Sequence, residues 1–327
     1  MHDDSNWKYG YPFVAIIGPT AVGKTDLVLN ISSELGAEVV SVDSMQVYRH
    51  MDIGTAKPTK QEQEKVRHHL VDIVDPDEEY NVQRFVEDAE CACRDIIAKG
   101  RVPILSGGTG LYLKGFEYGL FDLSEKQSID GGLQSDRDLL RAELSGQMET
   151  EKGREQMHLY LADIDPASAA RIHKNDRSRM IRALEIYKLT GITWSEHLKS
   201  QQGEHSGQGR LNILKIGLTS ERKILYERIN KRTELMMESG LVEEVKGLIE
   251  MGYSSSLKSM QSIGYKHINE YLAGNWGRDQ TIQNLARDTR RYAKRQFTWF
   301  HRDPGIKWFE TDQENEIKKT IKQYLKI

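Results

Sequence analysis

Short apolar runs alternate with amphipathic stretches over the first 119 residues of the chain. Strands are predicted at four runs, 13–17 (FVAII), 38–43 (EVVSVD), 70–74 (LVDIV) and 102–106 (VPILS). Between them, apolar residues recur at helical spacing over 27–35 and 82–97, and these helices are predicted to stop at Gly36 and Gly100. Strands that alternate with helices are typical of an α/β fold with a mainly parallel sheet.

The alternation ends near Gly119. Residues 123–200 contain no convincing strand and are predicted to form helices with turns, and the polar, Gly-rich stretch 200–210 is predicted to be a loop. The strand pattern returns in LNILKIGL (211–218), with helices predicted from there to the last residue. We therefore expect two domains: an α/β core formed by 1–122 and 204–327, with a helical C-terminal part, and a helical insertion domain at 123–203.

Composition is that of a globular protein. The 327 residues are 38% apolar and 29% charged, with a net charge of −3, which excludes global disorder and leaves room for a sizeable core. The N-terminal segment lacks an apolar region and no 18-residue apolar run occurs, so we expect a cytoplasmic protein without a membrane span. Cys91 and Cys93 would lie on different faces of one helix, which argues against a disulfide framework or a zinc site.

The first predicted strand runs directly into a phosphate-binding motif. GPTAVGKT fits G-x-x-x-x-G-K-[ST] without a mismatch, between a strand and a helix, and its residues are Gly18, Pro19, Thr20, Ala21, Val22, Gly23, Lys24 and Thr25. Backbone N–H groups of such a loop converge on phosphate oxygens at a helix N-terminus. Lys24 would neutralise the outer phosphate and the Thr25 hydroxyl would bind Mg²⁺. The motif predicts a P-loop NTPase-like core and a diphosphate or triphosphate ligand, without saying which.

Two further polar segments follow predicted strands. Asp43 ends the second strand, and Gly107, Gly108 and Thr109 follow the strand at 102–106. Ligands gather at the carboxyl ends of strands in doubly wound sheets, so these residues should face the phosphate loop. A carboxylate at Asp43 suits a general base that takes a proton from an acceptor nucleophile. In the helix that follows 211–218, Arg222 and Arg228 could hold a diphosphate, although an exposed helix surface explains them nearly as well.

Two basic segments interrupt the near-neutral chain. Residues 281–302 contain six Lys or Arg and one acid, and 171–188 contain six Lys or Arg against two acids. At about 100° per residue, one helix face carries Arg287, Arg291, Lys294 and Arg295. The opposite face carries Ile282, Leu285, Tyr292, Ala293 and Phe300. A solvated helix face would explain either segment alone, but two of them favour a polyanionic partner. The residues alone thus indicate a P-loop enzyme with a base at Asp43 and a nucleic acid as acceptor.

At this point the chain resembles the bacterial tRNA dimethylallyltransferases, also called tRNA isopentenyltransferases. The matching runs appear in the family's order over 16–302: IIGPTAVGKT, VSVDSMQVYRHMDIGTAKP, ILSGGTGLYLK, IHKNDRSRMIRALEIY, QSIGYK and AKRQFTWFHR. The resemblance implies transfer of a dimethylallyl group from its diphosphate to N6 of the adenosine 3′ of the anticodon. It implies Mg²⁺ as cofactor, with dimethylallyl diphosphate and the tRNA anticodon stem-loop as partners. Nothing in the sequence requires more than a monomer, so we expect one.

The resemblance also assigns roles to residues. Residues 18–25 would hold the diphosphate, assisted by Arg222 and Arg228, while Asp43 would be the catalytic base and Thr109 would help to fix the adenine. The implied tRNA contacts are Asp43, Ser44, Met45, Gln46, Thr109, Asn175, Asp176, Arg177, Arg179, Arg182, Gln261, Ser262, Ile263, Gly264, Tyr265 and Lys266, together with Arg287, Arg291 and Lys294. The stretch 123–138 departs from the family pattern, which leaves a contact by Arg141 in doubt.

Three other functions fit parts of the sequence. A P-loop small-molecule kinase would need neither basic segment, and an isopentenyltransferase acting on free adenine nucleotides would not need the long insertion. An RNA-binding protein with a degenerate nucleotide site would not need Lys24, Thr25, Asp43 and Thr109 together.

Overall fold

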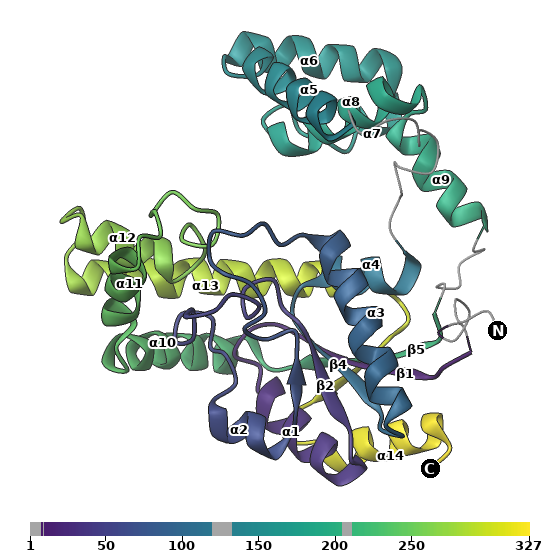
Figure 1. Ribbon diagram of the computed structural model, residues 1–327, viewed down its shortest axis with the longest axis vertical. Helices are drawn as coiled ribbons and strands as arrows, with labels where there is room; N and C mark the ends of the chain where they lie inside the picture. Colours follow the sequence, from purple (N-terminus) through teal and green to yellow (C-terminus); the bar gives the residue numbers. More distant parts are fainter. Residues whose placement is uncertain (1–7, 9, 120–132, 205–210) are drawn as a thin grey trace. The chain divides into compact units, whose positions relative to one another are not determined.

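The computed structural model describes residue 8 and residues 10–119, 133–204 and 211–327. The chain divides into two compact units, one formed by 1–119 with 210–327 and the other by 120–209 (Figure 1). The first unit is an α/β unit and the second is helical, so each is described by itself below.

A six-stranded sheet forms the centre of the α/β unit. Its strands are β1 (Phe13–Ile17), β2 (Glu38–Val42), β3 (His68–His69), β4 (Pro103–Gly107), β5 (Ile213–Thr219) and β6 (Ile306–Glu310). They lie in the order β3-β2-β4-β1-β5-β6, and every pair of neighbours is parallel. The predicted α/β class with a mainly parallel sheet is therefore confirmed.

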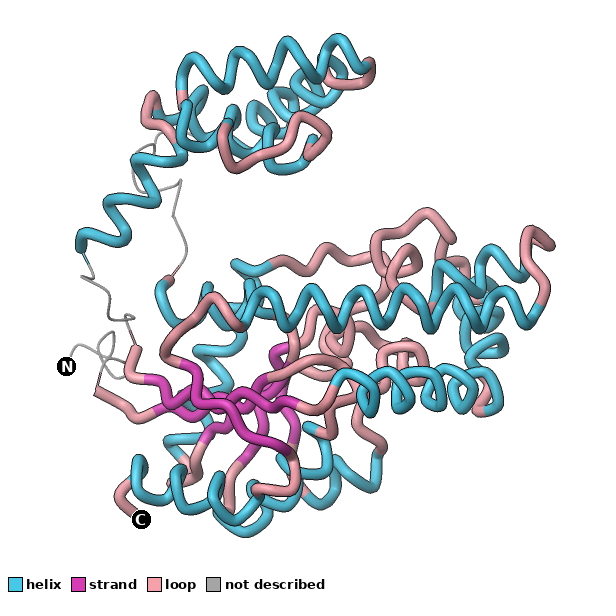
Figure 2. Tube along the Cα trace, turned by 180° about the vertical axis from the view of Figure 1, so that it is seen from behind, coloured by secondary structure: helices cyan, strands magenta, loops and turns pink. Residues whose placement is uncertain are grey.

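Helices cover both faces of the sheet (Figure 2). Val14 and Ile16 of β1 point into one core, which α1 (Lys24–Leu35) and α14 (Glu314–Leu325) close. Phe13, Ala15 and Ile17 point into the opposite core, against α3 (Val82–Ala98) and α4 (Gly110–Tyr118). Burial on both faces explains why the central strands are continuous apolar runs instead of alternating ones.

The remaining helices of this unit pack mainly on other helices. They are α2 (Lys60–Lys65), α10 (Arg222–Glu238), α11 (Leu241–Glu250), α12 (Tyr265–Leu272) and α13 (Arg278–Phe300). The predicted basic helix at 281–302 corresponds to α13, which packs along α10 and α12. Leu285, Ala293 and Phe300 are buried on its inner face, as their spacing predicted, while Arg291 and Lys294 are exposed.

The helical unit contains α5 (Leu133–Gln147), α6 (Glu151–Ile164), α7 (Pro166–Ala169), α8 (Arg177–Thr190) and α9 (Trp194–Glu204). Its own small core is built from Leu144, Met148, Leu161, Met180 and Leu184. The predicted absence of strands over 123–200 holds for the described part, 133–200. The predicted loop at 200–210 is corrected, because α9 continues to Glu204, and residues 205–210 lie outside the described residues.

The chain segments on either side of the helical unit are held together within the α/β unit. Leu211 donates its backbone N–H to the carbonyl of Glu117 at 3.2 Å. The buried Glu117 carboxylate accepts two hydrogen bonds from Lys215 Nζ, at 2.7 and 3.0 Å, and Lys215 also donates to Asp303 at 2.6 Å. A buried ion cluster therefore joins α4, β5 and the turn before β6.

Two predictions about strands were wrong. Residues 70–74 do not form a strand, because Leu70 and Asp72 adopt left-handed backbone conformations (φ 62° and 58°), and only Val74 forms a bridge, to Tyr48. The strand next to β2 is instead the polar pair His68–His69. Helices do not fill the whole C-terminal part either, since β6 adds a parallel strand beside β5.

Candidate functional site

The sheet register places three loops at one edge. Ile17 of β1 pairs with Gly107 of β4, and Gly107 also pairs with Val42 of β2. The phosphate loop, Asp43 and Gly108 come directly after these three residues, so they start side by side. A Cβ on residue 107 would lie 2.0 Å from the Val42 carbonyl oxygen, which explains why only glycine fits at this position. The register therefore brings the phosphate loop, Asp43 and the segment after β4 together, as predicted.

The phosphate loop curls around the ammonium of Lys24. Gly23 precedes α1 with φ 105°, and Lys24 Nζ donates to the carbonyls of Gly18 and Pro19 at 2.9 and 2.8 Å. Burial lowers the pKa of Lys24 to about 8, with Asp43 acting to raise it and Arg232 to lower it. Thr25 follows in the first turn of α1, where it is exposed.

Helix α10 brings two arginines to this loop. Arg228 Nη1 donates to the Val22 carbonyl at 3.0 Å, and Arg232 Nη1 donates to Thr20 Oγ1 at 3.4 Å. Burial lowers the pKa of Arg232, against the opposing effect of Asp43. The predicted partner of Arg228 was Arg222, but the Arg222 guanidinium lies over the ring of Tyr226, 5.0 Å from its centroid. The spacing of one helical turn would have indicated Arg232 instead.

Asp43 is held at the end of β2 by its own turn. Its Oδ1 accepts hydrogen bonds from the backbone N–H groups of Met45 and Gln46, at 2.8 and 3.3 Å. Its Oδ2 accepts no hydrogen bond from the described residues. Thr109 Oγ1 accepts from the N–H of Ser44 at 3.2 Å. Asp43, Ser44 and Thr109, all predicted to face the acceptor, are therefore neighbours, with one carboxylate oxygen available for a proton.

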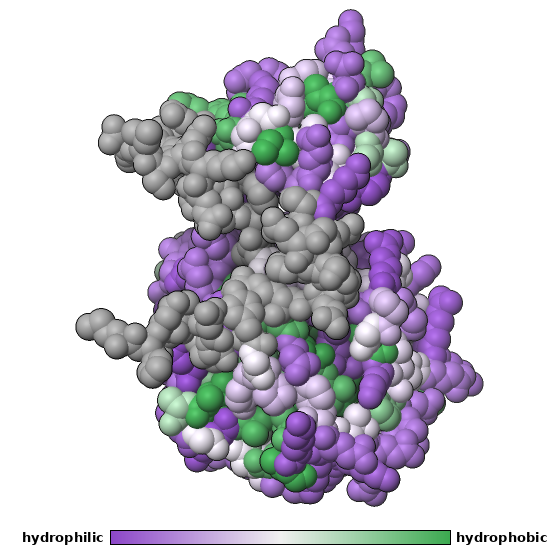
Figure 3. Space-filling view, turned by 90° about the vertical axis from the view of Figure 1, so that its right-hand side faces the viewer, coloured by the Kyte–Doolittle hydropathy of each residue, from purple (hydrophilic) through white to green (hydrophobic). Residues whose placement is uncertain are grey.

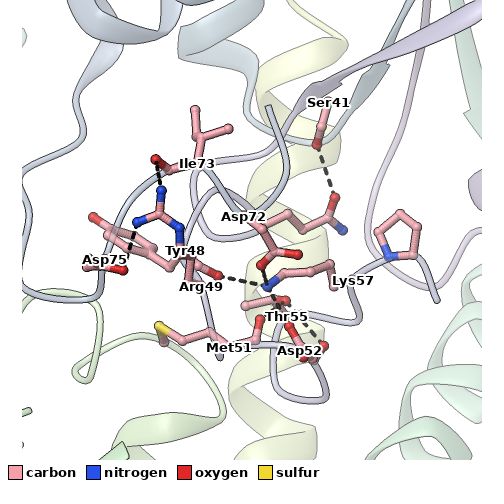
Figure 4. A network of polar contacts seen from close by, with 12 residues as sticks. Ser41, Tyr48, Arg49, Met51, Asp52, Thr55, Lys57, Asp72, Ile73 and Asp75 are labelled. Carbon is pink, nitrogen blue, oxygen red and sulfur yellow. Dashed lines mark hydrogen bonds and ion pairs between the residues drawn. The ribbon is translucent and has the colours of Figure 1, made fainter. Parts of the chain in front are cut away.

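A buried lysine fixes the loop that follows Asp43. Lys57 Nζ donates to the Tyr48 carbonyl at 2.7 Å and to the carboxylates of Asp52 and Asp72, both at 2.5 Å (Figure 4). Gln46 is bound within the same loop, because its amide accepts from Ser41 at 3.0 Å and donates to the Ala56 carbonyl at 3.3 Å. Sequence reasoning missed Lys57, since only its burial marks it as part of the site.

The stretch 261–266 supports this same loop. The Tyr265 hydroxyl donates to Glu244 at 2.6 Å, and Glu244 also accepts from the N–H groups of Asp52, Ile53 and Gly54, at 2.9, 2.7 and 3.1 Å. Tyr265 is fully buried, so its predicted direct contact with tRNA is corrected to a supporting one. The other predicted contacts of this stretch, including Gln261, Ser262 and Ile263, are at least partly exposed apart from the buried Gly264, and Lys266 pairs with Asp288.

The outer face of α13 carries a basic groove of about 460 Å³. Its lining residues are Arg291, Lys294, Arg295, Thr298, Trp299 and Arg302. Arg287, the third predicted contact, is exposed one turn earlier and pairs with Asp288 at 3.1 Å. Arg295 was predicted to lie on this basic face, whereas Trp299 was not assigned a role from the sequence. The inner face of α13 presents Gln296 to the phosphate loop, where it accepts from the Thr20 N–H at 2.9 Å.

Within the helical unit, the predicted tRNA contacts divide into two groups. Arg182 and Arg141 bind the fully buried Glu185 carboxylate, as Arg137 does. Burial alone would raise the pKa of Glu185, but hydrogen bonds from these arginines outweigh it and hold the pKa below its usual range. Arg182 and Arg141 thus stabilise this unit.

The second group lies at the start of α8. Asp176 caps the helix by accepting from the Arg179 N–H at 3.2 Å, and Arg177 donates to the Ser145 carbonyl at 2.9 Å. Asn175 donates its N–H to His173 at 3.2 Å, while the side chain of Arg179 is 65% exposed. Of the six predicted residues in this unit, Arg179 has the most exposed cation.

Over the described residues, no helix has the length and apolar character needed to cross a membrane. On the face drawn in Figure 3, hydrophilic side chains are interspersed with small hydrophobic patches. The described residues also contain no cluster of three or more His, Cys, Asp or Glu that could hold a metal ion by themselves.

Comparison with known proteins gives consistent matches over nearly the whole chain. Residues 46–303 match the IPP transferase family and residues 12–75 match Isopentenyl transferase. A tRNA dimethylallyltransferase of Desulfotalea psychrophila is 46% identical over 318 residues, covering 97% of each chain. That of Thermotoga maritima is 44% identical, covering 95% of this chain and 97% of the relative.

Solved structures agree with these relatives. The full-length tRNA isopentenylpyrophosphate transferase of Bacillus halodurans is 41% identical, with a TM-score of 0.69, over 96% of this chain and 97% of that one. A eukaryotic dimethylallyltransferase acting on tRNA is 30% identical, with a TM-score of 0.72, over 88% of this chain and 69% of that one.

Proposed function

The chain belongs to the IPP transferase family, and we propose that it transfers a dimethylallyl group from dimethylallyl diphosphate to N6 of the adenosine just 3′ of the tRNA anticodon. The observation that carries the proposal is the placement of Asp43 and Thr109 beside the phosphate loop by the register of β1, β4 and β2. This arrangement can hold a diphosphate at one side and an acceptor with a removable proton at the other.

The phosphate loop would stabilise the leaving group. When the bond between the allylic carbon and the diphosphate oxygen breaks, negative charge grows on the diphosphate, where Lys24, Arg228 and Arg232 converge. Mg²⁺ fits the donor set available here, since it binds through one or two protein oxygens together with substrate phosphates and water. Thr25 would supply a hydroxyl oxygen to the ion, which would neutralise further charge on the diphosphate.

Asp43 would act on the acceptor. The exocyclic amine of adenine is a poor nucleophile because its lone pair is delocalised into the ring, so it must lose a proton as the new C–N bond forms. The Asp43 Oδ2 atom is the acceptor for that proton, while two backbone N–H groups fix the orientation of the carboxylate through Oδ1. Thr109 and the 44–46 turn would position the adenine.

The basic groove on α13 would bind the phosphate backbone of the anticodon stem-loop, with Arg287 beside it. The target adenosine must leave its stack to enter the site, at a cost of a few kcal/mol, and phosphate contacts offset that cost. In the helical unit, Arg179 is the best placed of the predicted contacts, because its side chain is 65% exposed while, among the described residues, its guanidinium pairs only with the partly exposed Asp176 at the same helix start. All of these residues come from one chain, so we propose that a monomer suffices.

The alternatives leave more of the molecule without a role. A kinase acting on a small molecule, or a transferase acting on free adenine nucleotides, would use the phosphate loop and Asp43 but not a groove formed with four Lys or Arg residues. The groove therefore favours a polyanionic acceptor.

A transfer assay tests the proposed function. The protein is mixed with Mg²⁺, labelled dimethylallyl diphosphate and unmodified tRNA, with ATP and tRNA as a parallel arm. We expect label in the tRNA, and none when the target adenosine is replaced by another nucleoside. Consumption of ATP without prenyl transfer would instead identify a kinase or an ATPase.

A further inference from the structure

We propose that Gln296 is a positioning residue that couples the phosphate loop (18–25) to the loop that carries Thr109 (107–110), so that the two substrates are held at reacting distance. The proposal rests on the proposed function. The role proposed for Gln296 is to fix the position of one loop relative to the other, because contacts within each loop already account for its own conformation.

The side chain of Gln296 bridges the two loops directly. Its Oε1 accepts from the backbone N–H of Thr20 at 2.9 Å, and its Nε2 donates to the carbonyl of Gly108 at 3.0 Å. Only 6% of Gln296 is exposed, so both hydrogen bonds are protected from water. A neutral amide is the side chain that supplies one acceptor and one donor from the same planar group.

The packing around Gln296 leaves little freedom. A Cβ on Gly108 would lie 2.1 Å from Gln296 Nε2, so the glycine is needed for the amide to approach. One turn earlier on α13, burial raises the pKa of Tyr292, with Asp43 acting in the same direction, and hydrogen bonds to Thr109 and Gln296 oppose the rise.

The position of Gln296 on α13 connects this bridge to the tRNA surface. Lys294 and Arg295 precede it and line the basic groove, whereas Gln296 points inward to the loops. A rigid helix therefore carries the proposed phosphate contacts on one side and the bridge on the other. A displacement of about 1 Å between reacting groups can cost on the order of 100-fold in rate.

The kinetic test compares three variants with the native enzyme. Gln296→Met keeps the length of the side chain and removes both hydrogen bonds, whereas Gln296→Glu keeps the acceptor for Thr20 and places a carboxylate oxygen against the Gly108 carbonyl. Thr281→Val is the matched control, since it removes a buried hydrogen bond to Gly277 near the opposite end of the same helix. The concentration of folded protein is measured for each variant, and kcat and both KM values are determined.

We expect both Gln296 variants to lower kcat by roughly 10- to 100-fold per folded molecule, with each KM within about threefold of the native value. Thr281→Val should keep a native kcat. A purely structural role would lower the folded fraction and leave kcat per folded molecule unchanged, which would overturn the proposal. A rise in one KM alone would also overturn it, by showing that Gln296 serves a single substrate.

A second measurement does not depend on transfer. Hydrogen exchange is followed with and without inorganic pyrophosphate and Mg²⁺. In the native protein, binding should slow exchange in residues 18–25 and also in 107–110, whereas in Gln296→Met protection should be confined to 18–25. Equal protection of 107–110 in both proteins would refute the coupling. Failure of the native protein to modify tRNA would refute the proposed function instead, and the exchange result would still decide the bridge.

Discussion

Tyr265 donates a 2.6 Å hydrogen bond to Glu244, and through this contact α12 supports a loop more than 200 residues away in the sequence. The same carboxylate accepts three backbone N–H groups from residues 52–54. Together with Lys57, it fixes the loop that carries Gln46 beside Asp43. The contact joins the run QSIGYK (261–266) to the run VSVDSMQVYRHMDIGTAKP (40–58).

Replacement of Glu244 by Gln should destabilise the protein. An amide oxygen cannot accept all four hydrogen bonds that the carboxylate accepts, so some partners lose theirs, and the free energy of unfolding should fall by about 1–3 kcal/mol. Urea unfolding of Glu244→Gln measures the change. Glu243→Gln is the control, because its side chain is at least partly exposed in the same turn of α11. Equal stabilities of the two variants would contradict the role of Glu244.

Loss of the Asp43 carboxylate should slow the chemical step. Asp43→Ala is expected to lower turnover on the order of 100-fold or more, the usual effect of removing a general base, with little loss of tRNA affinity. Single-turnover transfer and filter binding of tRNA separate the two effects. Near-native turnover in this variant would assign the proton to another acceptor.

Diphosphate affinity should decrease above about pH 8. The pKa of Lys24 is about 8 without ligand, and a bound anion beside the ammonium would raise it. At pH values between the pKa of Lys24 in the free protein and its higher pKa in the complex, binding takes up a proton. Affinity should therefore fall by up to about tenfold for each unit of rising pH. Calorimetric titration with inorganic pyrophosphate and Mg²⁺ from about pH 7 to about pH 9.5 measures the decline. Lys24→Met should bind weakly at every pH and lose the decline, and a native protein with constant affinity over this range would refute the prediction.

The basic groove on α13 should set the salt dependence of tRNA binding. Replacing Arg291 and Lys294 together by Ala should weaken binding and reduce the slope of log K against log salt by about two. A matched pair near the C-terminus, Lys319 and Lys326, lines a different groove and should leave the slope unchanged when replaced by Ala. Binding measured at several salt concentrations distinguishes the two surfaces, and a native slope in the first variant would place the tRNA elsewhere.

The sequence predicts the central strands well because these strands are buried on both faces, which leaves an apolar run in each. It fails at the sheet edge. In LVDIV the apolar pattern is that of a strand, but the left-handed conformations of Leu70 and Asp72 interrupt it, and such a conformation leaves no trace in hydropathy. Strand β6 (IKWFE) buries only Ile306, and its apolar and polar residues neither alternate strictly nor form a continuous apolar run, so its sequence gives no clear strand signal.

The candidate site was predictable where its residues follow strands. The phosphate loop, Asp43 and Thr109 are marked by motif and by position at strand ends. Lys57 and Gln296 were not, because each is a polar residue of ordinary type whose role depends on burial or on contact with a distant loop. Arg232 was overlooked, although it follows Arg228 by one helical turn. The same limit as for Lys57 and Gln296 applies to Arg182, for which the resemblance implied a tRNA contact, and to Arg141, for which that contact was in doubt, because both are bound to the buried Glu185.

The hydrogen bond between Leu211 and Glu117 has a consequence for how this chain is organised. The α/β unit holds both ends of a detour of about 90 residues at adjacent positions, and the Glu117–Lys215–Asp303 cluster secures them. Closing that gap with a few glycines and serines would cost little loop entropy. We therefore expect that the helical unit can be removed, or exchanged with that of a relative, without a change in the sheet.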